Sequence, residues 1–151
     1  MVKRTSFEKA ECPIARSLDA LGDWWSLLII RDAFLGFRRF GEFQKHLGCA
    51  KNILTVRLRA LVDEGILTTA PASDGSAYQE YVLTPKGRGV SPVLVALRQW
   101  SEEYACEGGA FADVLIDRKN GQPVRRLELR AQDGRLLSQG DIEVRKRRRR
   151  A

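Results

Sequence analysis

Residues 38–87 read RRFGEFQKHLGCAKNILTVRLRALVDEGILTTAPASDGSAYQEYVLTPKG. Two short amphipathic helical patterns meet there at a tight turn, and two strand-like runs, 66–70 and 78–83, then flank the polar tip ASDGS. The order helix, turn, helix, strand, turn, strand predicts a winged helix-turn-helix. Such a domain presents a helix N-terminus and a β-hairpin on one side, where both can reach a DNA duplex.

The two helices of this motif are bounded by glycines. The first is expected from Gly41 to about His46, and Gly48 breaks it. The second is expected from Asn52 to Glu64, and Gly65 stops it. Three leucines, at i, i+4 and i+7, place one face of the second helix in the core: Leu54, Leu58 and Leu61.

Two further helices are expected before the motif. Pro13, suited to a first helical position, opens one after Cys12, and Gly22 ends it; its buried stripe is expected to be Ile14, Leu18 and Leu21. The next runs from Asp23, a plausible N-cap, to Leu35. It is apolar nearly all round, which predicts the central core helix. Its paired Trp24 and Trp25 are read as core side chains rather than a ligand cage.

The region after the motif divides into three parts. Thr84 and Pro85 cap a long helix to about Cys106, with apolar residues every three or four positions. Segments 114–117, 125–130 and 142–144 read as strands of a small antiparallel appendage. We therefore expect a mostly α fold with small β parts: a winged helix-turn-helix and dimerisation domain (1–106), a β appendage (107–144) and a disordered basic tail (145–151).

The charge distribution is more informative than the total. The net charge is +7, but the tail run Arg145–Arg150 supplies +6 of it, which leaves about +1 for the rest. Between Phe37 and Ala60 the basic residues face a single acid, Glu42. Positive charge therefore collects on the helix-turn-helix, where phosphate contacts need it. The tail either adds nonspecific DNA affinity or is a solvated end.

Composition narrows the functional class. The chain has 151 residues, with 44% hydrophobic and 30% charged, which is typical of a soluble globular protein. It lacks a span-length apolar run and a signal-peptide pattern, so a cytoplasmic location with no membrane partner is expected. Three cysteines and one histidine without a CxxC pair predict neither a disulfide framework nor a metal site. No cofactor or catalytic motif is indicated, so we expect no enzyme.

The second helix of the motif carries the candidate base-reading residues. Asn52 suits a bidentate contact with adenine, and Lys51 suits guanine or a phosphate. Thr55 can bond a base edge or touch a thymine methyl group. Arg59 is expected at a phosphate, and Arg57 either there or paired with an acid. The alternative is that all of them are solvated charges on an amphipathic helix.

Further backbone contacts are expected from the flanks of the motif. Arg38 and Arg39 precede its first helix and are candidates to clamp the DNA backbone. The tip of the wing carries no Lys or Arg, so Ser76 and Tyr78 are its candidate phosphate contacts, although a plain hairpin turn fits equally. His46 is expected to be a helix C-terminal cap or a neighbour of a phosphate.

Several of these segments together resemble the HxlR family of bacterial transcriptional regulators. The matching pieces are CPIARSLDALGDWWSLLIIRDAFLG, RRFGEFQKHLG, NILTVRLRALVDEGIL, EYVLTPKGR and LVALRQW, in family order. The resemblance implies a homodimeric winged-helix repressor or activator that binds a palindromic operator. It also implies that helices Cys12–Leu21 and Pro85–Cys106 form most of the dimer interface, with candidate contacts Ile14, Leu18, Val93, Leu97, Trp100 and Tyr104.

The resemblance also raises a sensing role for Cys12. Some members of the family respond to quinones, aldehydes or oxidants through a cysteine just before this proline, and a helix N-terminus favours a thiolate. The alternative is an inert capping cysteine. Cys49 also precedes a helix, beside Lys51, and is a second candidate whose modification would place a group at the DNA surface. Other hypotheses are a small-molecule effector bound in the dimer interface or appendage, and a winged helix used as a protein-interaction module.

Overall fold

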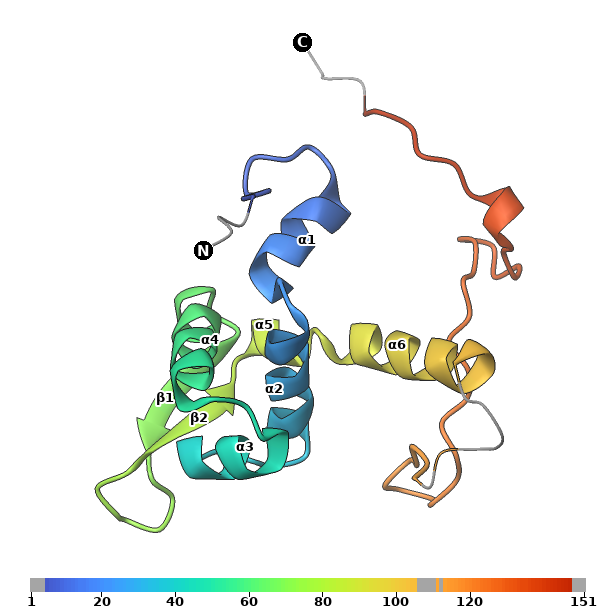
Figure 1. Ribbon diagram of the computed structural model, residues 1–151. Helices are drawn as coiled ribbons and strands as arrows, with labels where there is room; N and C mark the ends of the chain where they lie inside the picture. Colours follow the sequence, from blue (N-terminus) through green and yellow to red (C-terminus); the bar gives the residue numbers. More distant parts are fainter. Residues whose placement is uncertain (1–4, 106–110, 112, 148–151) are drawn as a thin grey trace. The chain divides into compact units, whose positions relative to one another are not determined.

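A computed structural model describes residues 5–105, 111 and 113–147 of the chain (Figure 1). Expectations for Cys106 and for the end of the basic tail lie outside these residues. The chain divides into two compact units, residues 1–94 and 95–151, which are described separately below.

The order of elements in the first unit matches the winged helix-turn-helix pattern. They are α1 (Pro13–Leu21), α2 (Trp24–Phe34), α3 (Phe40–Leu47), α4 (Lys51–Asp63), β1 (Leu67–Pro71), β2 (Gln79–Leu83) and α5 (Pro85–Arg88). Helix α6 (Ser91–Tyr104) begins in this unit and continues into the second. Of the helices in the described ranges, none combines the length and apolar character that a bilayer crossing requires.

Local signals bound α2, α3 and α4 close to the residues that the sequence predicts. The Asp23 carboxylate accepts a hydrogen bond from the Ser26 N–H at 2.9 Å and caps α2. Gly48 follows α3 in the left-handed region, at φ 65°, and Gly65 follows α4 at φ 69°. A left-handed residue at this place satisfies the last helical carbonyls, and glycine adopts it without steric strain.

The core of the first unit lies where α2, α3, α4 and the hairpin meet (Figure 1). The expected leucine stripe of α4 is fully buried, as are Ile29 and Ile30 of α2 and Phe43 of α3. Leu67 of β1 joins them, and β1 pairs with β2 in antiparallel register from Leu67↔Leu83 to Pro71↔Gln79. The prediction of α2 as the central helix is confirmed.

Three expected burials are wrong in the single chain. Trp24 is 72% exposed and Ile14 is 71% exposed, and Leu18 is exposed as well. An apolar stripe shows that a face can pack, but not what packs against it. Helix α1 has no buried residue, whereas Trp25 does pack against the core.

The expected long helix from Pro85 is broken. Helix α5 stops at Arg88, and α6 starts after a turn at Gly89 and Val90. The physical reason is Pro92, which has no N–H for the carbonyl of Arg88 and whose ring would clash with that carbonyl. The Val90 carbonyl instead accepts from Val93 and Leu94, which restarts the helix.

The expected strands of the appendage are also not formed. The described part of the second unit has two isolated bridges, Ile116↔Pro123 and Arg130↔Leu136, and a 3₁₀ turn at Gln139–Asp141. The chain turns between these segments with Gly121 at φ 69° and Gly134 at φ 88°. Apolar residues such as Leu127 and Leu129 stay exposed, so no buried face holds a ladder together.

Polar contacts attach this appendage to α6 within the second unit. The Gln99 side chain accepts from the Leu127 N–H at 2.8 Å and donates to the Arg125 carbonyl at 3.2 Å. Arg98 pairs with Asp113, and Arg126 pairs with Glu103. The segment is therefore held by hydrogen bonds and ion pairs on α6.

Candidate nucleic-acid interface

The exposed face of α4 carries most of the candidate base-reading residues. Lys51, Asn52, Thr55 and Arg59 are exposed, and Asn52 and Arg59 lie on the side opposite the buried leucines. The Thr55 hydroxyl donates to the Lys51 carbonyl at 2.8 Å, so its proton is already used. What Thr55 still offers to a base is a hydroxyl oxygen and a methyl group.

Val56 is an apolar surface residue of α4 that is absent from the candidates predicted from the sequence. It is exposed and lies one turn after Asn52, on the same side of the helix. An apolar side chain at this place suits the methyl group of thymine. The sequence signal for Val56 is that it is an apolar residue on the polar face of α4, away from the leucines.

Arg57 is bound to an acid in this structure. Its guanidinium lies 2.6 Å from the carboxylate of Asp23, the N-cap of α2. Of the two roles that the sequence left open for Arg57, the structure shows the pairing with an acid. This ion pair joins α4 to the start of the central helix.

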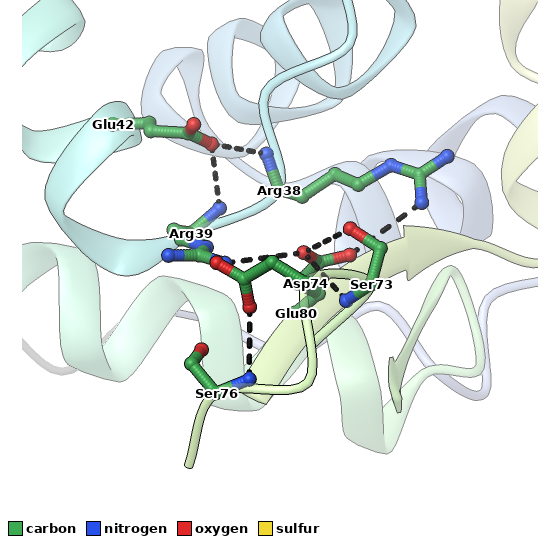
Figure 2. A network of polar contacts seen from close by, with 7 residues as sticks. All are labelled: Arg38, Arg39, Glu42, Ser73, Asp74, Ser76 and Glu80. Atoms are coloured by element: carbon green, nitrogen blue, oxygen red, sulfur yellow. Dashed lines mark hydrogen bonds and ion pairs between the residues drawn. The ribbon is translucent and has the colours of Figure 1, made fainter. Parts of the chain in front are cut away.

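Arg38 and Arg39 lie in a polar network with the wing (Figure 2). One oxygen of Glu42 accepts the backbone N–H groups of Arg38 at 2.8 Å and Arg39 at 2.9 Å. These bonds hold the pKa of Glu42 below its usual value. The Arg38 carbonyl accepts from the Tyr81 N–H of β2 at 2.7 Å, which ties the same segment to the wing.

Two carboxylates of the wing face these arginines. Asp74 contacts the Arg39 guanidinium at 2.5 Å, and Glu80 lies 3.5 Å from Arg38 and 3.7 Å from Arg39. Glu80 is buried and accepts from the backbone and the hydroxyl of Ser73 at 3.1 and 2.9 Å. Bonds from Ser73, and then Arg38, lower the pKa of Glu80.

Asp74 sits at the tip of the wing, where Ser76 donates its N–H to the carboxylate at 3.0 Å. That bond and the Arg39 guanidinium hold the pKa of Asp74 far below its usual range. The two guanidinium groups therefore face the carboxylates of Asp74 and Glu80, while the Glu42 carboxylate binds the backbone N–H groups of the same two arginines (Figure 2). Arg38 and Arg39, expected to clamp the DNA backbone, are in this structure paired with carboxylates that neutralise their charge.

The remaining wing candidates lie beside this cluster. Tyr78 is exposed, and the Arg39 guanidinium carbon lies 5.6 Å from the centre of its ring. Ser76 is exposed at the tip. Thr69, Pro71 and Tyr78 help to line a hollow along the hairpin. Both candidate side chains remain at the surface.

The two cysteine candidates differ in exposure. Cys12 is exposed and forms the N-cap position of α1, without a side-chain capping bond. Cys49 is 7% exposed and belongs to the hydrophobic core cluster. The expectation that Cys49 lies at the DNA surface is wrong, because its side chain packs inward before α4 begins.

His46 has a different partner from the two expected. Its Nδ1 atom lies 2.7 Å from a carboxylate oxygen of Asp32 in α2, and its ring packs against Phe37 at 4.8 Å between centroids. Asp32 is fully buried, and its other oxygen accepts from Arg31. His46 therefore joins α3 to α2 by satisfying a buried acid.

The residues expected at the dimer interface are at the surface of the single chain. Ile14 and Leu18 are exposed on α1, and α6 exposes Val93, Leu97, Trp100 and Tyr104. The rings of Trp100 and Tyr104 lie 5.9 Å apart. No residue of α6 is buried, which leaves its apolar positions open to contact.

Replacing Glu80 by glutamine should lower the melting temperature in a pH-dependent way. The pKa of Glu80 is lowered in the folded state from its ordinary value of 4.5. Its ionised carboxylate therefore stabilises the fold above that value, and this contribution disappears as the pH falls through the folded pKa. We expect the difference between wild type and Glu80→Gln to be largest near pH 7 and to shrink below about pH 4.

Thermal unfolding of the wild type and of Glu80→Gln between about pH 3 and pH 7 measures this difference in melting temperature. Glu64→Gln is the control, because the Glu64 side chain is 48% exposed and lies 4.0 Å from Lys86. A gap for Glu80→Gln that stays constant over this range would contradict the expectation.

Comparison with known proteins gives consistent matches. The model of the HxlR-like helix-turn-helix family matches residues 20–108. An uncharacterized HTH-type transcriptional regulator of Mycobacterium tuberculosis is 42% identical over 91 residues, or 60% of this chain. The match spans 58% of that relative, so the chain corresponds to little more than half of its length.

Solved structures match as well. PA1607, described as a candidate transcription factor, is 53% identical, with a TM-score of 0.88 over 95% of this chain and 100% of its own. The redox regulator HypR in its reduced form is 27% identical, with a TM-score of 0.57 over 62% of this chain and 94% of its own.

Proposed function

The chain belongs to the HxlR-like helix-turn-helix family of transcriptional regulators, and from this premise we propose that it binds a palindromic operator as a homodimer. In this proposal residues 1–106 bind DNA and dimerise. Residues 107–144 are an appendage, and residues 145–151 are a basic tail that adds nonspecific affinity.

One observation carries the proposal: the polar N-terminal half of α4 is exposed while its other face is anchored in the core. A helix held in this way can enter the major groove as a rigid body. Asn52 and Lys51 then read bases, and Arg59 contacts a phosphate. Ser76 and Tyr78 of the wing supply further backbone contacts.

The homodimer is supported by the unburied apolar residues of α6 and by Ile14 of α1. Large exposed apolar side chains in a water-soluble chain mark surfaces that a partner covers. Two copies related by a two-fold axis would present two α4 helices to two half-sites. A palindromic operator follows from that symmetry.

A response to oxidants or electrophiles is the second part of the proposal. Cys12 is exposed at the start of α1, where a reagent can reach its sulfur. The similarity to HypR, a redox regulator, supports this assignment. The alternatives are a small-molecule effector in the dimer interface or appendage, and a winged helix that binds a protein instead of DNA.

A binding titration with the DNA upstream of the gene tests the first part of the proposal. We expect a dissociation constant of about 10 nM or lower for one segment, and binding at least about a thousandfold weaker to a shuffled duplex. Two chains per duplex are expected. Equal affinity for both duplexes would reject an operator-specific role and favour the protein-interaction alternative.

The same titration after treatment with diamide tests Cys12. We expect the wild-type chain to lose operator affinity and Cys12→Ser to keep it. Cys49→Ser is the matched control, because its thiol is buried and the substitution should leave the response intact. A Cys12→Ser chain that still loses affinity normally would exclude Cys12 as the sensor.

A further inference from the structure

Arg38 and Arg39 are adjacent in sequence, but their side chains have different surroundings. Arg39 is 30% exposed and contacts Asp74 at 2.5 Å, Glu80 at 3.7 Å and the face of the Tyr78 ring. Arg38 is 52% exposed and has one long contact, 3.5 Å, to Glu80. Figure 2 shows both guanidinium groups directed toward the wing carboxylates.

We propose that Arg39 is a positioning residue, which latches the wing to the start of α3, and that its neighbour Arg38 is the one that contacts a DNA phosphate. This inference rests on the proposed function, because it assigns a phosphate contact to one arginine and the positioning of the wing to the other. Below, the latch means the contacts of Arg39 with Asp74, Tyr78 and Glu80.

The first argument is the cost of moving Arg39. A phosphate could replace Asp74 as its anion, but the contact with the Tyr78 ring would also be lost. Asp74, 54% exposed, would then stand unpaired beside the negatively charged duplex. Replacing Asp74 by a phosphate would therefore give Arg39 an equivalent anion but add repulsion between Asp74 and the duplex. The contact with Asp74 is the more favourable of the two.

The second argument is what the wing needs. An isolated two-stranded hairpin is marginally stable in water. The tip is closed within itself, since Ala72 donates to the Tyr78 carbonyl at 3.1 Å and Ser73 bonds Glu80. Those bonds shape the tip but do not orient it relative to α3. The Tyr81–Arg38 backbone bond holds the wing at β2, and the Arg39–Asp74 pair, 35 positions apart in sequence, adds the side-chain contact that orients its tip.

The third argument is that hydrogen bonds fix the backbone of both arginines. Glu42 accepts both of their backbone N–H groups, and the Arg38 carbonyl accepts from Tyr81. Truncating either side chain leaves these backbone bonds in place. Arg38→Ala and Arg39→Ala are therefore matched variants of one rigid segment, and they differ only in which guanidinium is removed.

The first test uses the full-length chain without DNA. Hydrogen exchange of the wing amides, residues 72–78, is compared for wild type, Arg39→Ala, Asp74→Ala and Arg38→Ala. We expect Arg39→Ala and Asp74→Ala to raise exchange by about two- to fivefold, the range of an exposed ion pair, and Arg38→Ala to leave it near wild type. Unchanged exchange in Arg39→Ala would overturn the latch.

The second test measures the salt dependence of binding, with the upstream duplex and a shuffled duplex as probes. Arg38→Ala should reduce the slope of log K against log salt by about 0.9 on both duplexes. Arg39→Ala should weaken binding severalfold with the slope unchanged. The double variant with Asp74→Ala should bind about as well as Arg39→Ala alone, because the Arg39–Asp74 ion pair is already lost in Arg39→Ala.

Two results would overturn the positioning role. One is a slope reduced by Arg39→Ala as much as by Arg38→Ala, which would make Arg39 a phosphate contact. The other is tighter binding by Asp74→Ala with an increased slope, which would make Asp74 a mask over that arginine. A wild-type chain that binds neither duplex would instead reject the proposed function, a result distinct from either slope change.

Discussion

Replacing Asn52 by alanine should weaken operator binding by about 5- to 150-fold, the range for losing one bidentate base contact. Binding to a shuffled duplex should change little, because nonspecific affinity comes from phosphate contacts. The reason lies in the placement of Asn52, exposed in the first turn of α4 on the face away from the core. Titrations of wild type and Asn52→Ala with both duplexes measure the effect.

Arg59→Ala is the control for this prediction. Arg59 is exposed two turns after Asn52 and is expected at a phosphate. Its removal should weaken binding to both duplexes alike and lower the salt slope by about 0.9. If Asn52→Ala instead weakens both duplexes equally, Asn52 does not read a base.

Replacing Gly87 by alanine should destabilise the fold by about 3 kcal/mol or more, at the upper end for overpacking. A Cβ atom at Gly87 would lie 2.1 Å from the backbone oxygen of Ile66 and 3.0 Å from a methyl carbon of Leu83. The Ile66 oxygen cannot easily withdraw, because it accepts from the Thr84 N–H at 3.1 Å and its hydroxyl at 3.2 Å. Urea unfolding of the purified chain measures the loss.

Gly41→Ala is the matched control. Gly41 lies within α3, and a Cβ atom there would meet nothing within 4 Å. Alanine should therefore stabilise the chain by about 0.5–1 kcal/mol, by favouring the helix and restricting the unfolded state. Equal and small effects of the two substitutions would mean that the turn at α5 yields, and that the contact with Ile66 is not rigid.

The sequence predicted the helices of the motif well because their signals are local. Gly48 and Gly65 end α3 and α4 through their own backbone freedom, and the leucines of α4 mark its buried face. The prediction of one long helix from Pro85 was wrong, although Pro92 is itself a local signal against a continuous helix. The prediction of strands in the appendage was also wrong, because strands need a partner surface that alternation alone does not provide.

The candidate site shows the same division. The exposed face of α4 was predictable, since one helix period separates a buried stripe from the polar residues opposite. The partners of Arg39, Arg57 and His46 were not. Asp74 lies 35 positions from Arg39, and Asp23 and Asp32 belong to a different helix from their partners.

By itself, the sequence determined the order of the elements from α1 to β2, the family and the exposed face of α4, because caps, periodicity and motifs act over a few residues. Only the tertiary structure decided which charges are free. In the sequence, Arg38 and Arg39 are candidates to clamp the DNA backbone. In the structure, the wing places Asp74 and Glu80 beside them. Pairing of charges depends on distances across the fold, and the Coulomb energy between two groups follows that distance rather than their separation along the chain.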